Sequence, residues 1–150
     1  MKKIISAIAL SMAFVLQAQA AEFSTLVGFN VDTQKASPGI AIGTRVSGFG
    51  VGYGIVEFQR NDKVSHAHIF SVSRDLYSKG DFAAGLKGGT AYLSREAATD
   101  GWVYHYSIYG AYKLADNYRI GVEYLQTRAP DSTLRPTDSS LVVASFRYRF

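Results

Sequence analysis

Residues 102–112, Trp-Val-Tyr-His-Tyr-Ser-Ile-Tyr-Gly-Ala-Tyr, alternate between two kinds of side chain. Aromatic and β-branched side chains share one parity, at Trp102, Tyr104, Tyr106, Ile108 and Tyr112. Polar and small side chains share the other parity, at His105, Ser107, Ala111 and Lys113. Because successive side chains of a β-strand point to opposite faces, the stretch predicts a strand with one apolar face and one polar face.

The same alternation returns in two later segments. In residues 118–125 the apolar parity holds Tyr118, Ile120, Val122 and Tyr124, and the other parity includes Arg119 and Glu123. In residues 142–150 the apolar parity holds Val142, Ala144, Phe146, Tyr148 and Phe150, opposite Ser145, Arg147 and Arg149. A small soluble barrel would have to bury these charges in an apolar core, at high cost. A transmembrane barrel has apolar residues toward lipid and polar residues inside, so the pattern favours that architecture.

Five earlier segments have similar length and spacing. They are residues 23–31, 39–46, 49–58, 64–76 and 82–93, which brings the predicted strands to eight. An even number of strands suits a barrel whose two ends lie on the same side of the membrane. Unpaired backbone groups are very costly in hydrocarbon, so such a sheet has to close. We therefore predict an all-β fold, an eight-stranded antiparallel transmembrane β-barrel of the outer membrane.

The connections between these segments alternate in length. Residues 47–48, 78–81 and 114–117 form short turns, whereas residues 32–38, 94–101 and 128–139 form longer polar loops. Residues 61–63 are a short exception on the loop side. Outer-membrane barrels have short periplasmic turns and longer outer loops, which orients the chain. The interior of an eight-stranded barrel is filled by its own side chains, so we expect a polar plug and no open channel.

The N-terminal 20 residues predict a secretory signal peptide. Lys2 and Lys3 precede an apolar run at residues 4–16, and small residues follow at Ala18 and Ala20. The run is too short to span a bilayer as a helix and ends in a signal-peptidase pattern. We expect residues 1–20 to be cleaved and residues 21–150 to form the barrel, exported to the outer membrane of a Gram-negative bacterium. An uncleaved signal anchor is the alternative interpretation.

Composition excludes several other classes of protein. The formal charge of the whole chain is +4, and removal of Lys2 and Lys3 lowers it to +2, so no nucleic-acid partner is predicted. The chain has no cysteine, which excludes thiol chemistry and cysteine-ligated metal sites. We predict no cofactor. A soluble secreted barrel that binds a small apolar ligand remains a further alternative, and it would be extracted from cells without detergent.

The last five residues, Phe146-Arg147-Tyr148-Arg149-Phe150, carry a family resemblance. They resemble the terminal strand that the outer-membrane assembly machinery recognises, and their ending resembles that of the OmpX/Ail class of small barrels. That class usually has glycine where this chain has Ser145. The resemblance implies an eight-stranded barrel with a role in adhesion, serum resistance or envelope integrity. It also implies contact with lipopolysaccharide or an external partner through the outer loops, which are shorter here.

A second resemblance concerns the tripeptide His105-Tyr106-Ser107. It resembles the His-x-Ser of PagL-type lipid A deacylases, eight-stranded barrels that hydrolyse an ester with Ser, His and Glu. The resemblance implies Ser107 as nucleophile, His105 as base and Glu123 as the acid that orients it. The family's Asn-Ala-Gly is absent, since Ile108, Tyr109 and Gly110 follow Ser107. The other interpretation is a polar interior in which His105 and Glu123 satisfy each other.

We therefore expect a non-enzymatic barrel with no catalytic residues, and a lipid A ester hydrolase is the alternative. The predicted polar interior comprises Arg45, Lys87, His105, Arg119, Glu123, Arg147 and Arg149. Cations predominate in this set, so either Glu22 and Glu57 contribute or solvent enters the periplasmic end. The predicted lipid-facing surface comprises Trp102, Tyr104, Tyr106, Tyr118, Tyr124, Phe146, Tyr148 and Phe150. We expect Trp102 and Tyr92 in an outer aromatic girdle, and Tyr118, Tyr148 and Phe150 in an inner one.

Two smaller groups of residues are candidates for binding. His66 and His68 form an i, i+2 pair that could hold a metal ion, but no third ligand is evident and we predict no metal site. We expect the two histidines to be exposed polar residues near the outer rim. Basic residues of the outer loops could contact lipopolysaccharide phosphates, namely Lys63, Arg95, Arg128 and Arg135.

Overall fold

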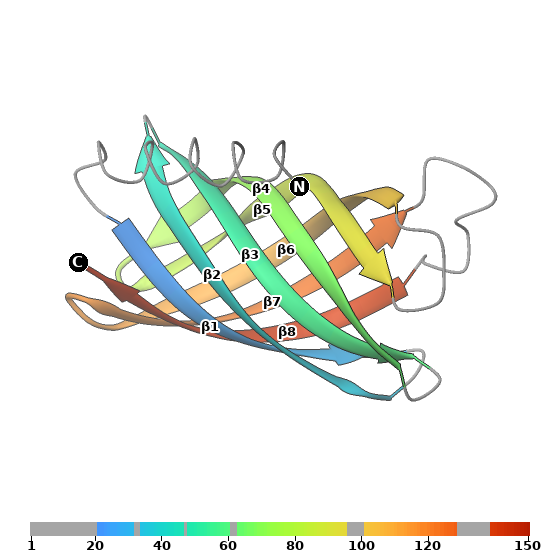
Figure 1. Ribbon diagram of the computed structural model, residues 1–150. Coiled ribbons are helices and arrows are strands. Elements are labelled where there is room, and N and C mark those ends of the chain that lie inside the picture. Colours follow the sequence, from blue (N-terminus) through green and yellow to red (C-terminus); the bar gives the residue numbers. More distant parts are fainter. Residues whose placement is uncertain (1–20, 32–33, 47, 61–62, 96–100, 129–138) are drawn as a thin grey trace.

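The computed structural model describes residues 21–31, 34–46, 48–60, 63–95, 101–128 and 139–150, and the predicted signal peptide at residues 1–20 lies outside them. Eight strands make up the structure (Figure 1). In chain order they are β1 (Ala21–Asn30), β2 (Ala36–Val46), β3 (Phe49–Arg60), β4 (Lys63–Lys79), β5 (Phe82–Arg95), β6 (Gly101–Ala115), β7 (Tyr118–Arg128) and β8 (Ser139–Arg149). In the described part of the chain, no helix is long and apolar enough to cross a membrane.

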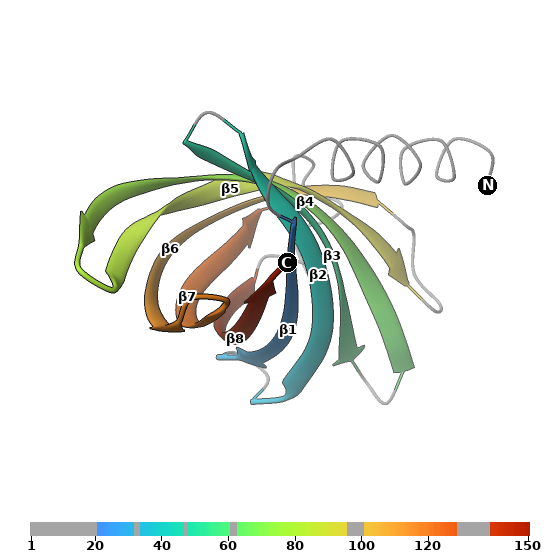
Figure 2. The ribbon, with the colours of Figure 1, turned by 90° about the vertical axis from the view of Figure 1, so that its left-hand side faces the viewer.

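The strands form one closed barrel in which each strand pairs with its neighbours in the chain. Every pairing is antiparallel, and β1 pairs with β8 to complete the ring, as the end-on view in Figure 2 shows. The predicted fold class is therefore confirmed. Hydrogen bonds from the Phe150 amide to the Ala21 carbonyl and from the Arg149 amide to the Asn117 carbonyl tie down the last residues of β8.

The two ends of the barrel differ. The strand ends of β2 and β3, of β4 and β5, and of β6 and β7, each pair two residues apart, meet at one end, which we call the turn end and which also holds Ala21 and Phe150. The opposite end, the loop end, carries the remaining connections. Gly48 and Gly80 have positive φ angles of 83° and 59°, which a glycine adopts without steric cost. At the third turn Asp116 accepts a hydrogen bond from Lys113 at 2.7 Å, which lowers the pKa of the Asp116 carboxyl.

β4 is longer than the pattern predicts, ending at Lys79 and not at residue 76. The β4–β5 register shifts between Asp75 and Tyr77, so the period of two breaks there. Phe49, the first residue of β3, pairs with Arg74. The residues of β4 from Asp75 onward therefore extend past the start of β3. The β4–β5 hairpin therefore projects beyond β3 at the turn end.

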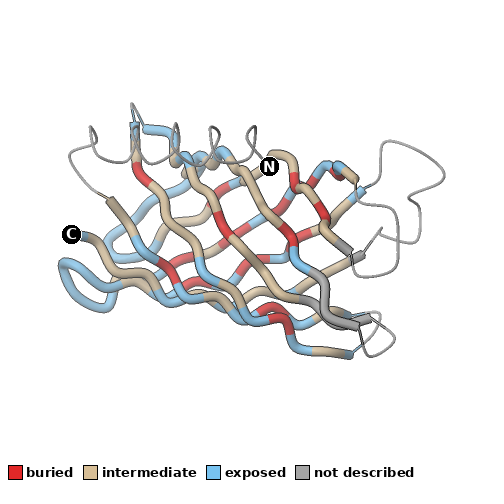
Figure 3. Tube along the Cα trace, viewed as in Figure 1, coloured by how far each residue is buried: buried red, intermediate tan, exposed pale blue. Residues whose placement is uncertain are grey.

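The outer surface of the barrel is apolar and the inner surface is mixed. Along β6, Trp102 is 51% exposed and the next residue, Val103, is 1% exposed, and this alternation continues to Ala111 (Figure 3). Exposed aliphatic and aromatic side chains occur on all eight strands. Contiguous apolar surface on that scale is rare on soluble monomers. It is the sidedness of a barrel that spans a membrane.

The interior differs between the two halves of the barrel that follow one another along its axis. Toward the loop end a small apolar core is formed by Ala67, Ala91, Leu93 and Val103, with Ile69 packed against it. Toward the turn end many of the inward side chains are charged, and the others are mostly small. The inner face of β2 and β3 is lined by Ala41 and by glycines at positions 39, 43, 50, 52 and 54. This thin wall leaves room for the long side chains that β5, β6 and β7 direct inward.

Candidate functional site

The charged half of the interior is held together by side chains from strands that are not neighbours. Arg45 of β2 binds Asp75 of β4 through two hydrogen bonds of 2.5 and 3.3 Å. The Tyr109 hydroxyl of β6 donates to the same carboxylate at 2.5 Å. Sequence reasoning did not identify Asp75 or Tyr109 as interior residues. Alternation along the strands could have identified them. Asp75 lies on the same side of its strand as Ser71 and Ser73, and Tyr109 lies on the same side as His105 and Ser107.

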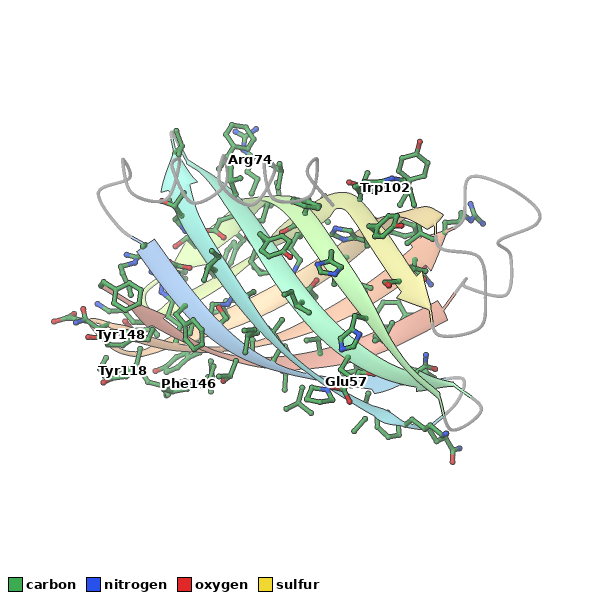
Figure 4. All side chains as sticks on the ribbon, viewed as in Figure 1. Glu57, Arg74, Trp102, Tyr118, Phe146 and Tyr148 are labelled. Carbon is green, nitrogen blue, oxygen red and sulfur yellow. The ribbon has the colours of Figure 1, made fainter. Side chains whose placement is uncertain are left out.

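A second ion pair spans the seam that closes the barrel. Glu22 of β1 lies directly opposite Arg149 of β8 in the register. The Arg149 guanidinium donates to the Glu22 Oε1 from Nη2 at 2.6 Å and from Nε at 3.2 Å. Glu22 thus supplies one of the interior acids expected to balance the cations. Glu57, named with Glu22 in one of the two alternatives, lies on the outer face opposite His66 and does not contribute to the interior (Figure 4).

The third pair involves Glu123, the acid of the alternative esterase interpretation. Lys87 of β5 donates to Glu123 of β7 at 2.5 Å, reaching across β6, which lies between these strands. The Glu123 side chain is 7% exposed and that of Lys87 is 23% exposed. The second carboxylate oxygen of Glu123 is buried and has no hydrogen-bond partner among the described residues. Lys87 is therefore the ionic partner of Glu123.

His105 and Ser107 lie on the inner face of β6, and their hydrogen bonds lead to the backbone. His105 donates from Nε2 to the Phe70 carbonyl at 3.1 Å, since a carbonyl can only accept, and its Nδ1 has no partner in the described structure. Ser107 donates to the Lys87 carbonyl at 3.5 Å. The interpretation that His105 and Glu123 satisfy each other is wrong. His105 can reach across β5 because Gly89 stands opposite it, where a Cβ would collide with the Phe70 carbonyl.

Two further arginines add positive charge at the turn end. Arg119 and Arg147 are directly opposite each other in the β7–β8 register, and neither forms an ion pair with any described residue. The Arg147 guanidinium lies 5.9 Å from the centre of the Tyr109 ring. The five cations of the predicted interior set therefore face three acids: Glu22, Asp75 and Glu123. This imbalance places a net positive charge near the turn end.

The outer face has aromatic clusters near both ends, separated along the barrel axis in Figure 4. Toward the loop end, Trp102 contacts Tyr92 and Phe70, with ring centroids 5.3 and 6.3 Å apart. Toward the turn end, Tyr118 contacts Phe146 and Tyr148 at 5.7 and 5.1 Å, and Tyr148 contacts Phe150 at 5.2 Å. Aromatic clusters near both ends are the arrangement expected of the two girdles of a transmembrane barrel.

His66 and His68 lie on the outer face near the aromatic cluster of the loop end. His68 Nδ1 is 2.7 Å from the Tyr53 hydroxyl, and the two rings stack. His66 is exposed and pairs in register with Glu57. The described residues include no group of three or more His, Cys, Asp or Glu side chains that could hold a metal ion.

No protein-family model matches the sequence, and no curated protein sequence matches it. Among solved structures the barrel is similar to Neisserial surface protein A, with a TM-score of 0.64 and 13% identity over 87% of this chain and 95% of that chain. It is also similar to two designed transmembrane β-barrels, each 16% identical. One has a TM-score of 0.54 and covers 89% of this chain and 98% of its own. The other, TMB2.3, has a TM-score of 0.56 and covers 87% and 94%. These similarities establish the fold of small transmembrane barrels, as the resemblance to the OmpX/Ail class implied.

Proposed function

We propose that this chain is a non-enzymatic β-barrel of the Gram-negative outer membrane, with a structural or surface-contact role in the cell envelope. The observation that carries the proposal is the sidedness of the barrel, in which apolar and aromatic side chains face outward and ion pairs face inward. Only a surrounding lipid phase makes that arrangement favourable. The turn end then faces the periplasm and the loop end faces outward.

The filled interior supports a structural role over solute transport. An apolar cluster lies in the loop half, and three ion pairs lie on the inner wall of the turn half. What remains for function is the outer surface and the loop end. There Arg128 is exposed, near the Trp102 cluster, in a position suited to a lipopolysaccharide phosphate. The other basic residues predicted for this contact, at positions 63, 95 and 135, lie outside the described side chains.

The alternative function is a PagL-type lipid A deacylase that uses Ser107, His105 and Glu123. An esterase of this kind needs the serine hydroxyl to donate to the histidine and the histidine to donate to the acid. Here Ser107 donates to a backbone carbonyl, His105 donates to another, and Lys87 holds Glu123. All three are buried on the inner face, whereas a lipid substrate approaches from outside. The geometry therefore favours the non-enzymatic function.

One experiment on cells separates these functions. The outer-membrane fraction is run boiled and unboiled on detergent gels, and lipid A from the same cells is analysed by mass spectrometry. Strains express the wild type, Ser107→Ala, or the matched control Ser24→Ala, which removes another buried inward serine. We expect a faster unboiled band and identical lipid A in all three strains. Loss of an acyl chain that is reversed by Ser107→Ala alone would overturn the proposal, and a protein extracted without detergent would contradict its location.

The envelope role has its own test. Deletion of the gene should sensitise cells to detergent combined with a chelator, because both challenge the packing of the lipopolysaccharide leaflet. Re-expression of the wild type should restore resistance. Equal survival of deleted and complemented strains would exclude a role in envelope integrity.

A further inference from the structure

We propose that a groove on the outer face of β4, β5 and β6 binds one phospholipid of the periplasmic leaflet, with its phosphate on Arg74 and an acyl chain over Gly88. This inference rests on the proposed location in the outer membrane. The groove has a volume of about 500 Å³, is bordered also by Phe49 of β3 and by Tyr124 and Gln126 of β7, and opens toward the surrounding lipid.

Gly88 creates the groove. It lies on the lipid-facing parity of β5, between Val72 of β4 and Tyr106 of β6, and both of these side chains are exposed. Phe49, Leu86 and Ile108 extend the apolar walls. A Cβ added at Gly88 would meet only the His105 carbonyl, at 3.6 Å, so nothing in the backbone there demands glycine. The missing side chain leaves a groove in the outer surface that suits an acyl chain.

Arg74 supplies the charge at one end of this groove. It shares the outward parity of Val72, and its guanidinium lies 5.2 Å from the centre of the Phe49 ring. Phe49 is the first residue of β3 after the turn at residues 47–48, so the pair belongs to the turn half of the barrel. Figure 4 shows Arg74 projecting outward, away from the level of Trp102.

A cation on the lipid-facing surface is destabilising unless it reaches an anion at the interface. Arg74 forms no ion pair within the described structure. Lys87 also borders the groove, but its ammonium group points inward to Glu123. A lipid phosphate at this level would supply the anion that Arg74 lacks within the described structure. At the periplasmic level that lipid is a phospholipid, whose phosphate suits the two-pronged guanidinium.

The barrel carries an internal control for this site. A second outer groove, of about 590 Å³, lies over Gly110 between Phe82 and Tyr112 of β5 and β6 and the exposed side chains of β7, β8 and β1. It is similarly apolar, but its lining includes no charged residue. A Cβ at Gly110 would meet only the Phe82 ring, at 3.6 Å. A leucine at either glycine would thus fill one groove with little effect on the backbone.

Native mass spectrometry of the purified barrel in detergent tests the proposal. The probes are dioleoylphosphatidylglycerol and dioleoylglycerol, which has the same chains without the phosphate. We expect one phosphatidylglycerol per wild-type barrel and at least fivefold weaker binding of dioleoylglycerol. Arg74→Gln and Gly88→Leu should each weaken phosphatidylglycerol binding at least fivefold, and Gly110→Leu should leave it unchanged.

The contrary outcomes are specific. Equal binding of the two probes, or an equal loss in Gly88→Leu and Gly110→Leu, would overturn the site. Displacement of phosphatidylglycerol by equimolar lipopolysaccharide would also overturn it, because the occupant would then belong to the outer leaflet. Gel migration with and without boiling is recorded for every variant. A barrel that shifts on boiling but binds no phospholipid leaves the proposed function standing and removes only this inference.

Discussion

Glu123 is buried on the inner face of β7, and Lys87 is its ionic partner. Removing one member of a buried ion pair leaves an uncompensated charge and typically costs roughly 3–5 kcal/mol, whereas replacing both by apolar residues is often neutral. We expect Lys87→Met to lower the free energy of unfolding by about 3 kcal/mol and Lys87→Met/Glu123→Leu to restore most of it. The measurement is urea unfolding in detergent, followed by the fluorescence of Trp102, the single tryptophan.

Lys113→Met is the matched control, because Lys113 pairs with the fully exposed Asp116. Exposed pairs contribute little to stability, so this variant should unfold close to wild type. If Lys87→Met and Lys113→Met unfolded alike, the pair between Lys87 and Glu123 would have no special role.

The sequence could predict the direction of these side chains but not their partners. Parity alone placed Lys87 and Glu123 on the polar face. Their contact depends on two strand registers and on reach across β6, which no local pattern encodes. The same limit explains Asp75, whose partners Arg45 and Tyr109 lie on strands two positions away in the barrel.

At the scale of strands, β5 fits against β6 by placing glycines opposite large side chains. Gly85 faces Tyr109 and Gly89 faces His105 in the register. A Cβ at Gly85 would collide with the Arg74 carbonyl and lie 2.7 Å from the Tyr109 hydroxyl. These two glycines therefore allow β6 to direct its bulky residues across the inner face of β5.

Substitution of these glycines should distinguish the two faces of β5. We expect Gly85→Ala to destabilise the barrel by roughly 1–3 kcal/mol through overpacking. Gly88→Ala, on the outer face, should stay within about 0.5 kcal/mol of wild type. Both replacements restrict the unfolded chain equally, so the difference reports the native barrel. Equal midpoints in urea would show that Gly85 is not required for packing.

The periodicity of the sequence predicted the number of strands and the apolar outer face, but it did not predict where each strand ends. β4 was expected to end at residue 76 and ends at Lys79. The register shift between Asp75 and Tyr77 breaks the alternation there, and a bulge of this kind has no signature in a single sequence. The pairing of β4 with β3 and β5 shows that His66 and His68 lie on the outer face, which depends on strand register as well as on sequence.

Over the whole molecule, the two halves of the interior obstruct a solute in different ways. Val103 and Ala91 are almost fully buried in the loop half, together with Leu93 and Ala67. An apolar lining of this kind disfavours the entry of water and ions. In the turn half the inner wall carries the pairs Arg45–Asp75, across β3, and Lys87–Glu123, across β6. Either half alone would resist the passage of ions.

We therefore expect the wild-type barrel to produce no discrete conductance steps in planar lipid bilayers. Leu93→Ser/Val103→Ser should admit water to the loop half without adding bulk. Because the paired charged side chains of the turn half would still project into the interior, this variant should show at most brief, small events. Steady steps with the wild-type protein would mean that an aqueous path runs past both halves. In that case the filled interior would no longer argue against transport, and the structural role proposed for the protein would lose its main support.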